Sequence, residues 1–150
     1  FPRSKSENRI FMNSSELVNL AKKHVIGCHT ASHHRMNIGD TTAKLELEIS
    51  EAKEQLESII RKSIKCFAWV GGELRTYTLA AYNTIKRAGF IYGFATNSCP
   101  ILSADSDKLN IQRTNIESDA KPHLVIFQLS GIMDLKFWSK RRRINKMFNA

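Results

Sequence analysis

Two histidines, His29 and His33, are the side chains of this sequence best suited to binding a metal ion. They lie four residues apart in the segment 26–33, IGCHTASH. Imidazole nitrogens are common ligands of divalent ions, and a helical turn between the two residues would let both rings reach one ion. The chain has five histidines, so such a pair also arises by chance, and two surface histidines after a strand are the alternative.

The elements around this pair alternate between helices and short apolar strands. A strand that ends at His29 would place both imidazoles at a strand end, where α/β folds build their sites. Asn13, Ser14 or Ser15 can cap the helix before that strand. The expected elements are, in order, a helix to about residue 23, a strand over 24–28, a helix over 41–61, a strand over 64–70, a helix over 76–87 and a strand over 90–95.

The helix over 41–61 has the clearest periodicity in the chain. Its apolar residues recur at steps of three and four, which places them on one face; they are Leu45, Ile49, Ala52, Leu56 and Ile59. Its charged residues, Glu48 among them, are expected elsewhere on the helix. Alternation of helices with short apolar strands predicts an α/β fold with parallel strands. Beyond Pro100 we expect one more short strand near 109–113 and mainly helix over 123–140.

The composition bounds the class of protein. The chain has 150 residues, 42% hydrophobic and 25% charged, which is typical of one soluble globular domain and argues against disorder. No apolar run reaches the length of a membrane-spanning helix. Cys28, Cys66 and Cys99 form no CxxC pair, so neither a zinc ribbon nor a disulfide framework is indicated. The cysteine usage favours a reducing, cytoplasmic setting.

The net charge is +9, from 23 Lys and Arg against 14 Asp and Glu. Part of it is the run 140–143, KRRR, for which a solvated basic tail is the simplest interpretation. Contact with a polyanion or with a membrane surface is the alternative. Nucleic acid is not expected as a partner, because no aromatic residues are interleaved with the run.

Residues 27–33, GCHTASH, resemble the histidine motif of the polysaccharide deacetylase family, also called the NodB-homology domain. Further segments resemble that family in the same order, and this order makes the resemblance specific. They are the helix 12–21, the helix start at 48–56, the strand 67–72 (FAWVGG), the segment 88–96 (AGFIYGFAT) and the element 112–117 (QRTNIE). The resemblance covers about residues 12–117.

The resemblance implies part of a distorted (β/α) barrel, with parallel strands and outer helices. It implies a hydrolase that removes N-acetyl or O-acetyl groups from sugars with metal-activated water, so the partner is an acetylated carbohydrate. His29 and His33 would be metal ligands together with an aspartate, and zinc is the first candidate because imidazole suits it. Gly71 would stabilise the oxyanion through its N–H, and Arg113 would orient a catalytic carboxylate.

The chain departs from the family pattern at several positions. The paired aspartates of the family's first strand have no match, since no DD occurs in the sequence. We therefore expect a deacetylase domain without its N-terminal part, inactive in this form, with its core at 12–117 and a basic helical extension over 118–150. Val70 and Gly71 stand where the family has Pro and Tyr. His123 is the only candidate for the family's late histidine, in a context that does not fit.

The roles of Trp69 and His34 and the class of protein each have an alternative interpretation. Trp69 can stack on a sugar ring, although core packing is the simpler role. His34 is expected to point away from the metal. The alternative to an enzyme is a non-enzymatic module that binds polyanions through the C-terminal basic run, with binding that depends steeply on salt.

Overall fold

A single parallel sheet of four strands organises the chain. The computed structural model describes residues 11–97, 106–116 and 118–148. The strands are β1 (Gly27–Cys28), β2 (Cys66–Ala68), β3 (Tyr92–Ala95) and β4 (Ile111–Gln112), and they lie in the order β1-β2-β3-β4. All three pairings are parallel. The predicted α/β fold with parallel strands is confirmed.

The register places the carboxyl ends of all four strands at one edge of the sheet. Cys28 pairs with Phe67, and Phe94 pairs with both Ala68 and Ile111. Gly93 is required at its position in β3, because a Cβ there would lie 2.1 Å from the carbonyl oxygen of Leu109. The sequence beyond each strand end therefore forms one layer of loops, and that layer contains the two histidines.

The first strand is shorter than predicted. Helix α1 (Ser14–Leu20) begins at Asn13, whose side chain accepts the Glu16 N–H, while the Glu16 carboxylate accepts the Asn13 N–H. At the other end the His24 N–H still donates to the carbonyl of Leu20. Val25 is 83% exposed. Only Gly27 and Cys28 of the predicted strand 24–28 pair with β2. His24 still belongs to the turn that ends α1, and the two residues after it join neither the turn nor the strand.

The predicted helix over 41–61 is present but consists of three segments. These are α2 (Thr42–Leu45), a π-helix η1 (Glu46–Glu51) and α3 (Ala52–Ile60). All five residues predicted to face inward are buried or packed against the core. The expectation for Glu48 was wrong, because its side chain is fully buried. It lies three residues after Leu45 and four before Ala52, on the same face as the core residues.

The predicted helix over 76–87 begins later than expected. A 3₁₀ turn, η2 (Leu74–Thr76), precedes α4 (Leu79–Arg87), and the Thr78 side chain caps α4 by accepting the Ala81 N–H. Gly89 follows α4 with φ +77°, a left-handed conformation that suits glycine at a helix end. Helix α4 buries four residues against the rest of the core: Ala81, Tyr82, Thr84 and Ile85.

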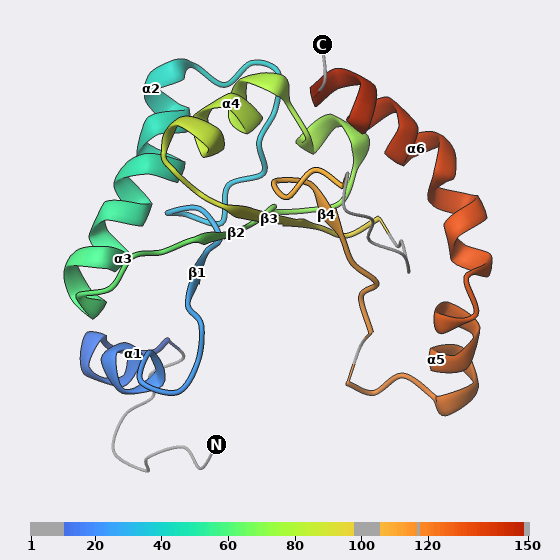
Figure 1. The fold of residues 1–150 in the computed structure, drawn as a ribbon, viewed down its shortest axis with the longest axis horizontal. Coiled ribbons are helices and arrows are strands. Elements are labelled where there is room, and N and C mark those ends of the chain that lie inside the picture. Colours follow the sequence, from blue (N-terminus) through green and yellow to red (C-terminus); the bar gives the residue numbers. More distant parts are fainter. Residues whose placement is uncertain (1–10, 98–105, 117, 149–150) are drawn as a thin grey trace.

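Two helices, α5 (Pro122–Leu129) and α6 (Ile132–Phe148), follow β4. Figure 1 shows them together on the side of the molecule opposite α2 and α3. Ile144 and Phe148 of α6 are buried, and the Phe148 ring stacks on Tyr82 at 4.3 Å and on Trp69 at 5.8 Å. Helix α6 therefore contributes to the same hydrophobic core as the sheet.

Trp69 is a core residue. Its side chain is 1% exposed, and its ring packs between Tyr77 and Phe148. The alternative in which it stacks on a sugar is wrong, because no face of its indole is open. Cys28 is buried as a free thiol and Cys66 is partly buried, whereas Cys99 lies outside the described residues. Among the described residues, no helix combines the length and apolar character needed to cross a membrane.

Candidate metal site

The loop that follows β1 brings the two candidate metal ligands into contact. The imidazole rings of His29 and His33 have centres 4.9 Å apart and planes inclined by 68°. Both residues are exposed. The pair therefore lies at the carboxyl end of the sheet and is open to solvent.

The tautomer of His29 follows from one hydrogen bond. Its Nδ1 lies 2.8 Å from the carbonyl oxygen of Ala68, at the end of β2. A carbonyl oxygen only accepts, so Nδ1 carries the proton and Nε2 keeps its lone pair. A backbone carbonyl in this position is the usual partner of a metal-binding histidine, because it orients the ring and makes the other nitrogen more basic.

The backbone between the histidines is not the helical turn expected from their spacing. Thr30 and His33 have φ values of +66° and +59°, in the left-handed region. For a β-branched residue such as Thr30 this conformation is strained, and strain of this kind gathers at functional sites. Two left-handed residues in place of a helical turn make the loop compact enough for its two rings to touch.

Glu48 of the π-helix holds this loop. Its carboxylate accepts the N–H of Ser32 at 2.9 Å and the hydroxyl of Ser32 at 2.6 Å. Its backbone carbonyl accepts the N–H of Ala31 at 3.1 Å, and the Thr30 hydroxyl accepts the N–H of His34 at 2.9 Å. The strained loop is thus fastened to the helix through both the main chain and the side chain of a single residue.

Glu48 is ionised despite its burial. Burial opposes its charge, but hydrogen bonds from Lys44 and from Ser32 outweigh that effect and lower its pKa to about 2. The Lys44 ammonium lies 2.8 Å from the carboxylate, one turn earlier in the same helix. The loop is therefore fastened to a charged and fully buried acceptor.

The distance between the two ring centres can be compared with that expected for a shared divalent ion. Metal–nitrogen bonds of about 2.1 Å at near-tetrahedral angles place two imidazole centres roughly 5 Å apart. The observed spacing of 4.9 Å matches this. Within the part of the chain that the structure describes, no third His, Cys, Asp or Glu joins the pair in a group that could hold an ion. The carboxylate of Asp40 pairs with Nε2 of His34 at 2.9 Å and not with the two candidate ligands.

The loop after β2 contains Gly71, which was predicted to stabilise an oxyanion. Gly71 has φ +82°, and no hydrogen bond from its N–H is found among the described residues. The neighbouring Glu73 carboxylate accepts the N–H of Gly72 at 3.2 Å. Hydrogen bonds from the N–H groups of Glu73 and Gly72 lower the pKa of Glu73. The N–H groups of this loop therefore stabilise a negatively charged oxygen in the folded protein.

Two cations border the Gly71 loop. Arg35, from the histidine loop, pairs with Glu73 at 2.9 Å. From α6, the Lys140 ammonium donates to the carbonyl of Gly72 and lies 5.8 Å from the centre of the Tyr77 ring. Burial lowers the pKa of Lys140, and the charge of Glu73 opposes that effect. The expectation of a fully solvated basic run was wrong for this lysine.

Arg113 lies at the opposite end of the strand order from the two histidines. It follows β4, and its N–H donates to the carbonyl of Ala95 at 3.0 Å. Its guanidinium contacts Asn115 at 3.3 Å, and no ion pair of Arg113 with a carboxylate is found among the described residues. Parallel strands about 4.8 Å apart place β4 roughly 14 Å from β1. The structure brings His29, His33 and the Gly71 loop to neighbouring strand ends and leaves Arg113 two strands beyond β2.

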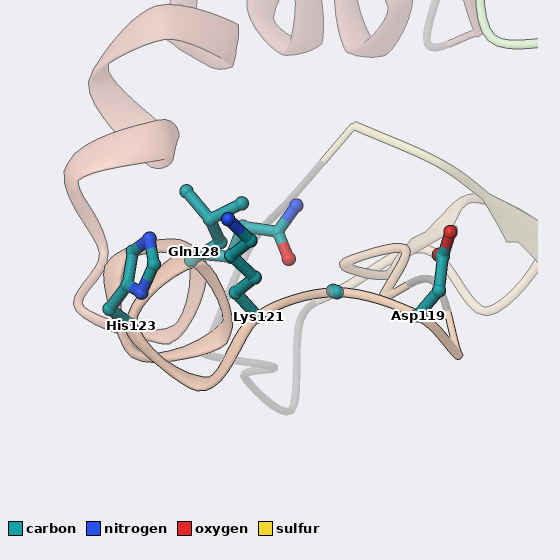
Figure 2. Close-up of a pocket in the computed structure, with 6 residues that line it drawn as sticks. Asp119, Lys121, His123 and Gln128 are labelled. Atoms are coloured by element: carbon teal, nitrogen blue, oxygen red, sulfur yellow. The ribbon is translucent and has the colours of Figure 1, made fainter.

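His123 is distant from the histidine pair. It belongs to the first turn of α5, and Figure 1 shows α5 beyond β4, at the far side from β1. It borders a pocket of about 480 Å³ (Figure 2) in which His123 and Asp119 lie at opposite ends. All residues that line this pocket come from 119–128, so it is separate from the candidate metal site.

Sequence reasoning missed Glu48 and Lys140 as neighbours of the site. The sequence does contain a signal for Glu48, because its position lies on the apolar face of the predicted helix. A carboxylate that is buried there needs hydrogen-bond or ion-pair partners. For Lys140 no signal existed, since its contact with Gly72 spans 68 residues of sequence.

The fold is similar to those of several solved deacetylases. The Streptococcus pyogenes deacetylase PplD, solved in complex with acetate, superposes with a TM-score of 0.65 at 17% identity, over 79% of this chain and 50% of that one. A polysaccharide deacetylase from Bacillus cereus gives 0.64 at 18% identity, over 79% and 36%. A de-N-acetylase from Aggregatibacter actinomycetemcomitans gives 0.63 at 15% identity, over 86% and 58%.

These likenesses confirm the expected fold, part of a NodB-type barrel. The chain spans between 36% and 58% of the length of these three proteins. A search of curated proteins gave no match. The sequence profile of the family described as polysaccharide deacetylase matches residues 7–92, more than half of the 150 residues. This chain therefore belongs to the polysaccharide deacetylase family.

Proposed function

We propose that this chain is the metal-binding part of a hydrolase that removes acetyl groups from the sugar residues of a polysaccharide or of its precursor. The observation that carries the proposal is the pair of imidazoles, 4.9 Å apart at the carboxyl end of β1, in a chain of this family. Further support comes from the Streptococcus pyogenes deacetylase of similar fold, which was solved with acetate, the product expected from such a reaction.

His29 and His33 are the proposed ligands of a divalent ion, and zinc is the first candidate because imidazole suits it. The supporting feature is the bond from Nδ1 of His29 to Ala68, which leaves Nε2 free to ligate. When bound, such an ion polarises an acetyl carbonyl and lowers the pKa of a water molecule. The role of the protein is to hold both rings in place, and Glu48 does so by fastening the loop between them.

The N–H of Gly71 is the proposed donor to the oxyanion that forms when the acetyl carbonyl is attacked. The adjacent N–H of Gly72 already binds a carboxylate oxygen of Glu73, which supports an anion-stabilising role for this loop. The Glu73 side chain is 45% exposed. It can therefore turn into solvent when substrate arrives.

Arg113 is proposed to orient a catalytic carboxylate, because its planar guanidinium can hold both carboxylate oxygens. It is exposed at the carboxyl end of β4. The same edge of the sheet holds the histidine loop, which supports a shared site. The carboxylate it would orient is not among the partners of Arg113 in the described residues.

Zinc binding and acetate release test the proposal. We expect equilibrium dialysis to give one Zn²⁺ per chain, and a double variant His29→Ala, His33→Ala to lose it. His24→Ala is the matched control, because His24 is exposed and lies before β1. Acetate released from an acetylated glucosamine polymer would then be measured with zinc present, after a strand with the family's paired aspartates is joined to the N-terminus of the chain. Equal zinc binding by the double variant and the control would refute the metal site, and zinc binding without acetate release by the extended chain would refute the proposed hydrolysis.

The alternative of a polyanion-binding module has less support. Lys140 donates to the Gly72 carbonyl and Arg141 to the Asn97 carbonyl. Of the run 140–143, only Arg142 and Arg143 are exposed. Two of the four cations of this run therefore bind backbone carbonyls within the fold, which leaves two exposed cations to contact a polyanion.

A further inference from the structure

Helices α5 and α6 expose an unusual amount of apolar surface. None of the residues of α5 is buried, although most of them are apolar. A helix that is apolar on all sides is normally enclosed by protein or lipid. The exposed large side chains form what we call the α5–α6 apolar surface: Leu124, Ile126, Phe127 and Leu129 of α5, and Ile132, Leu135 and Trp138 of α6.

The outward face of α6 is held firmly in position. Ile144 and Phe148 anchor the opposite face of the helix in the core. On the outward face, Leu135 is 81% exposed and Trp138 is 56% exposed. Figure 1 shows α5 and α6 along the outer side of the molecule, away from α2 and α3. The apolar surface is therefore presented by an anchored helix.

Positive charge surrounds this apolar surface. Across 118–148 the exposed cations are Lys121, Lys136, Arg142, Arg143 and Lys146. The Arg142 guanidinium lies over the Trp138 ring, 5.4 Å from its centre. The two acidic residues of this stretch are Asp119 and Asp134, and Asp134 lies 3.8 Å from Arg141. The surface thus combines exposed aromatic and aliphatic side chains with an excess of cations.

We propose that the α5–α6 apolar surface binds the surface of an anionic lipid bilayer. Helices with apolar and aromatic side chains flanked by Lys and Arg lie in the headgroup layer, where acyl chains cover the apolar atoms and anionic lipids pair with the cations. A nucleic acid would satisfy the cations and leave the apolar side chains in water. A second copy of the chain would cover the apolar side chains and bring two sets of cations together. Of these three occupants, an anionic bilayer is the one that satisfies both features.

Binding in this way would set the position of the candidate site. The inward face of α6 contacts the Gly71 loop, because Lys140 donates to Gly72. A helix with its side chains is roughly 10 Å across. The bilayer surface and the Gly71 loop would therefore lie on opposite sides of one helix, and the site would act close to the membrane.

Vesicle flotation with the intact chain tests this inference, independently of metal binding or acetate release. We expect the chain to float with phosphatidylcholine vesicles that contain phosphatidylglycerol, to stay behind with phosphatidylcholine alone, and to be released as salt rises. Fluorescence adds a local readout, because the chain has two tryptophans and Trp69 is buried. A blue shift of the emission on binding would come from Trp138.

Two matched variants separate the apolar surface from simple charge attraction. Leu135→Glu places a charge on the surface and should weaken vesicle binding by about tenfold or more. Val25→Glu makes the same change of charge at a residue that is 83% exposed and lies before β1, and it should bind nearly as the parent does. Both changes are at exposed positions, and circular dichroism would check that both variants fold.

Three outcomes would overturn the proposal. The first is failure to float with anionic vesicles at low salt. The second is equal weakening by Leu135→Glu and Val25→Glu, which would indicate charge attraction alone. The third is a dimer in sedimentation velocity that Leu135→Glu dissociates, without any vesicle binding, which would mean that a second copy covers this surface.

Discussion

Replacing Glu48 by Gln should destabilise the protein at neutral pH, and the loss should disappear as the pH falls. Gln has the shape of Glu, and its amide can still accept the Ser32 N–H and donate to the Ser32 hydroxyl. The change therefore removes the charge and little else. Lys44, the partner that would be left, is 42% exposed and can turn into water.

The magnitude follows from the pKa of Glu48. Its folded value of about 2, against an ordinary value of 4.5, corresponds to about 3 kcal/mol of stability when the carboxylate is ionised in both states. A group whose pKa is lowered on folding contributes this stability above its unfolded pKa and loses it as the pH falls through its folded pKa. We therefore expect Glu48→Gln to cost about 2–3 kcal/mol at pH ~7, and about three-fifths of that at pH ~3.5.

Urea unfolding of the parent and the variant at a series of pH values measures this difference. Glu46→Gln is the matched control, because Glu46 lies in the same π-helix with its side chain 38% exposed, paired with Arg87. Exposed pairs contribute about 0–1 kcal/mol, so the control should change stability little. A cost for Glu48→Gln that is the same at pH ~7 and pH ~3.5, or no larger than that of Glu46→Gln, would refute a buried, ionised Glu48.

Three further changes test the fold. Arg61 ends α3 in a left-handed conformation, so Arg61→Gly should raise stability by about 1 kcal/mol in thermal unfolding, and a loss would contradict that backbone. Gly93→Ala would place a Cβ 2.1 Å from the Leu109 carbonyl, so we expect loss of cooperative unfolding, and a stable variant would contradict the β3–β4 register. Phe148→Ala removes a ring stacked on Tyr82 and should cost about 3–5 kcal/mol in urea unfolding, whereas a cost near zero would mean that α6 does not pack on the core.

The order of elements could be predicted from the sequence because it depends on local patterns. Apolar residues at steps of three and four predicted the helix over 41–61, and short apolar runs predicted the strands. The π-helix inside that helix could not be predicted from local periodicity. Its Glu48 carbonyl accepts the N–H of Ala31 from the loop after β1, a contact between residues far apart in the sequence. The inward packing of α6 was missed for a similar reason, since it depends on contacts between residues far apart in the sequence.

The candidate site was predictable in part. Residue type and spacing led to His29 and His33, and the structure places their rings in contact. The backbone that brings them together was not predictable, because a left-handed threonine is unfavourable by itself and is stabilised here by Glu48 and by the His34 N–H. Their role as metal ligands stays a prediction, as do the roles of Gly71 and Arg113.

The central claim, that two imidazoles share one cation, is tested most directly by the nitrogen NMR signals of the histidine side chains during a zinc titration. We expect Nε2 of His29 and a ring nitrogen of His33 to shift together and to saturate at one Zn²⁺ per chain, while Nδ1 of His29 keeps its proton and His24 is unchanged. Shifts at His29 and His33 with separate midpoints, or no larger than those at His24, would contradict a shared ion.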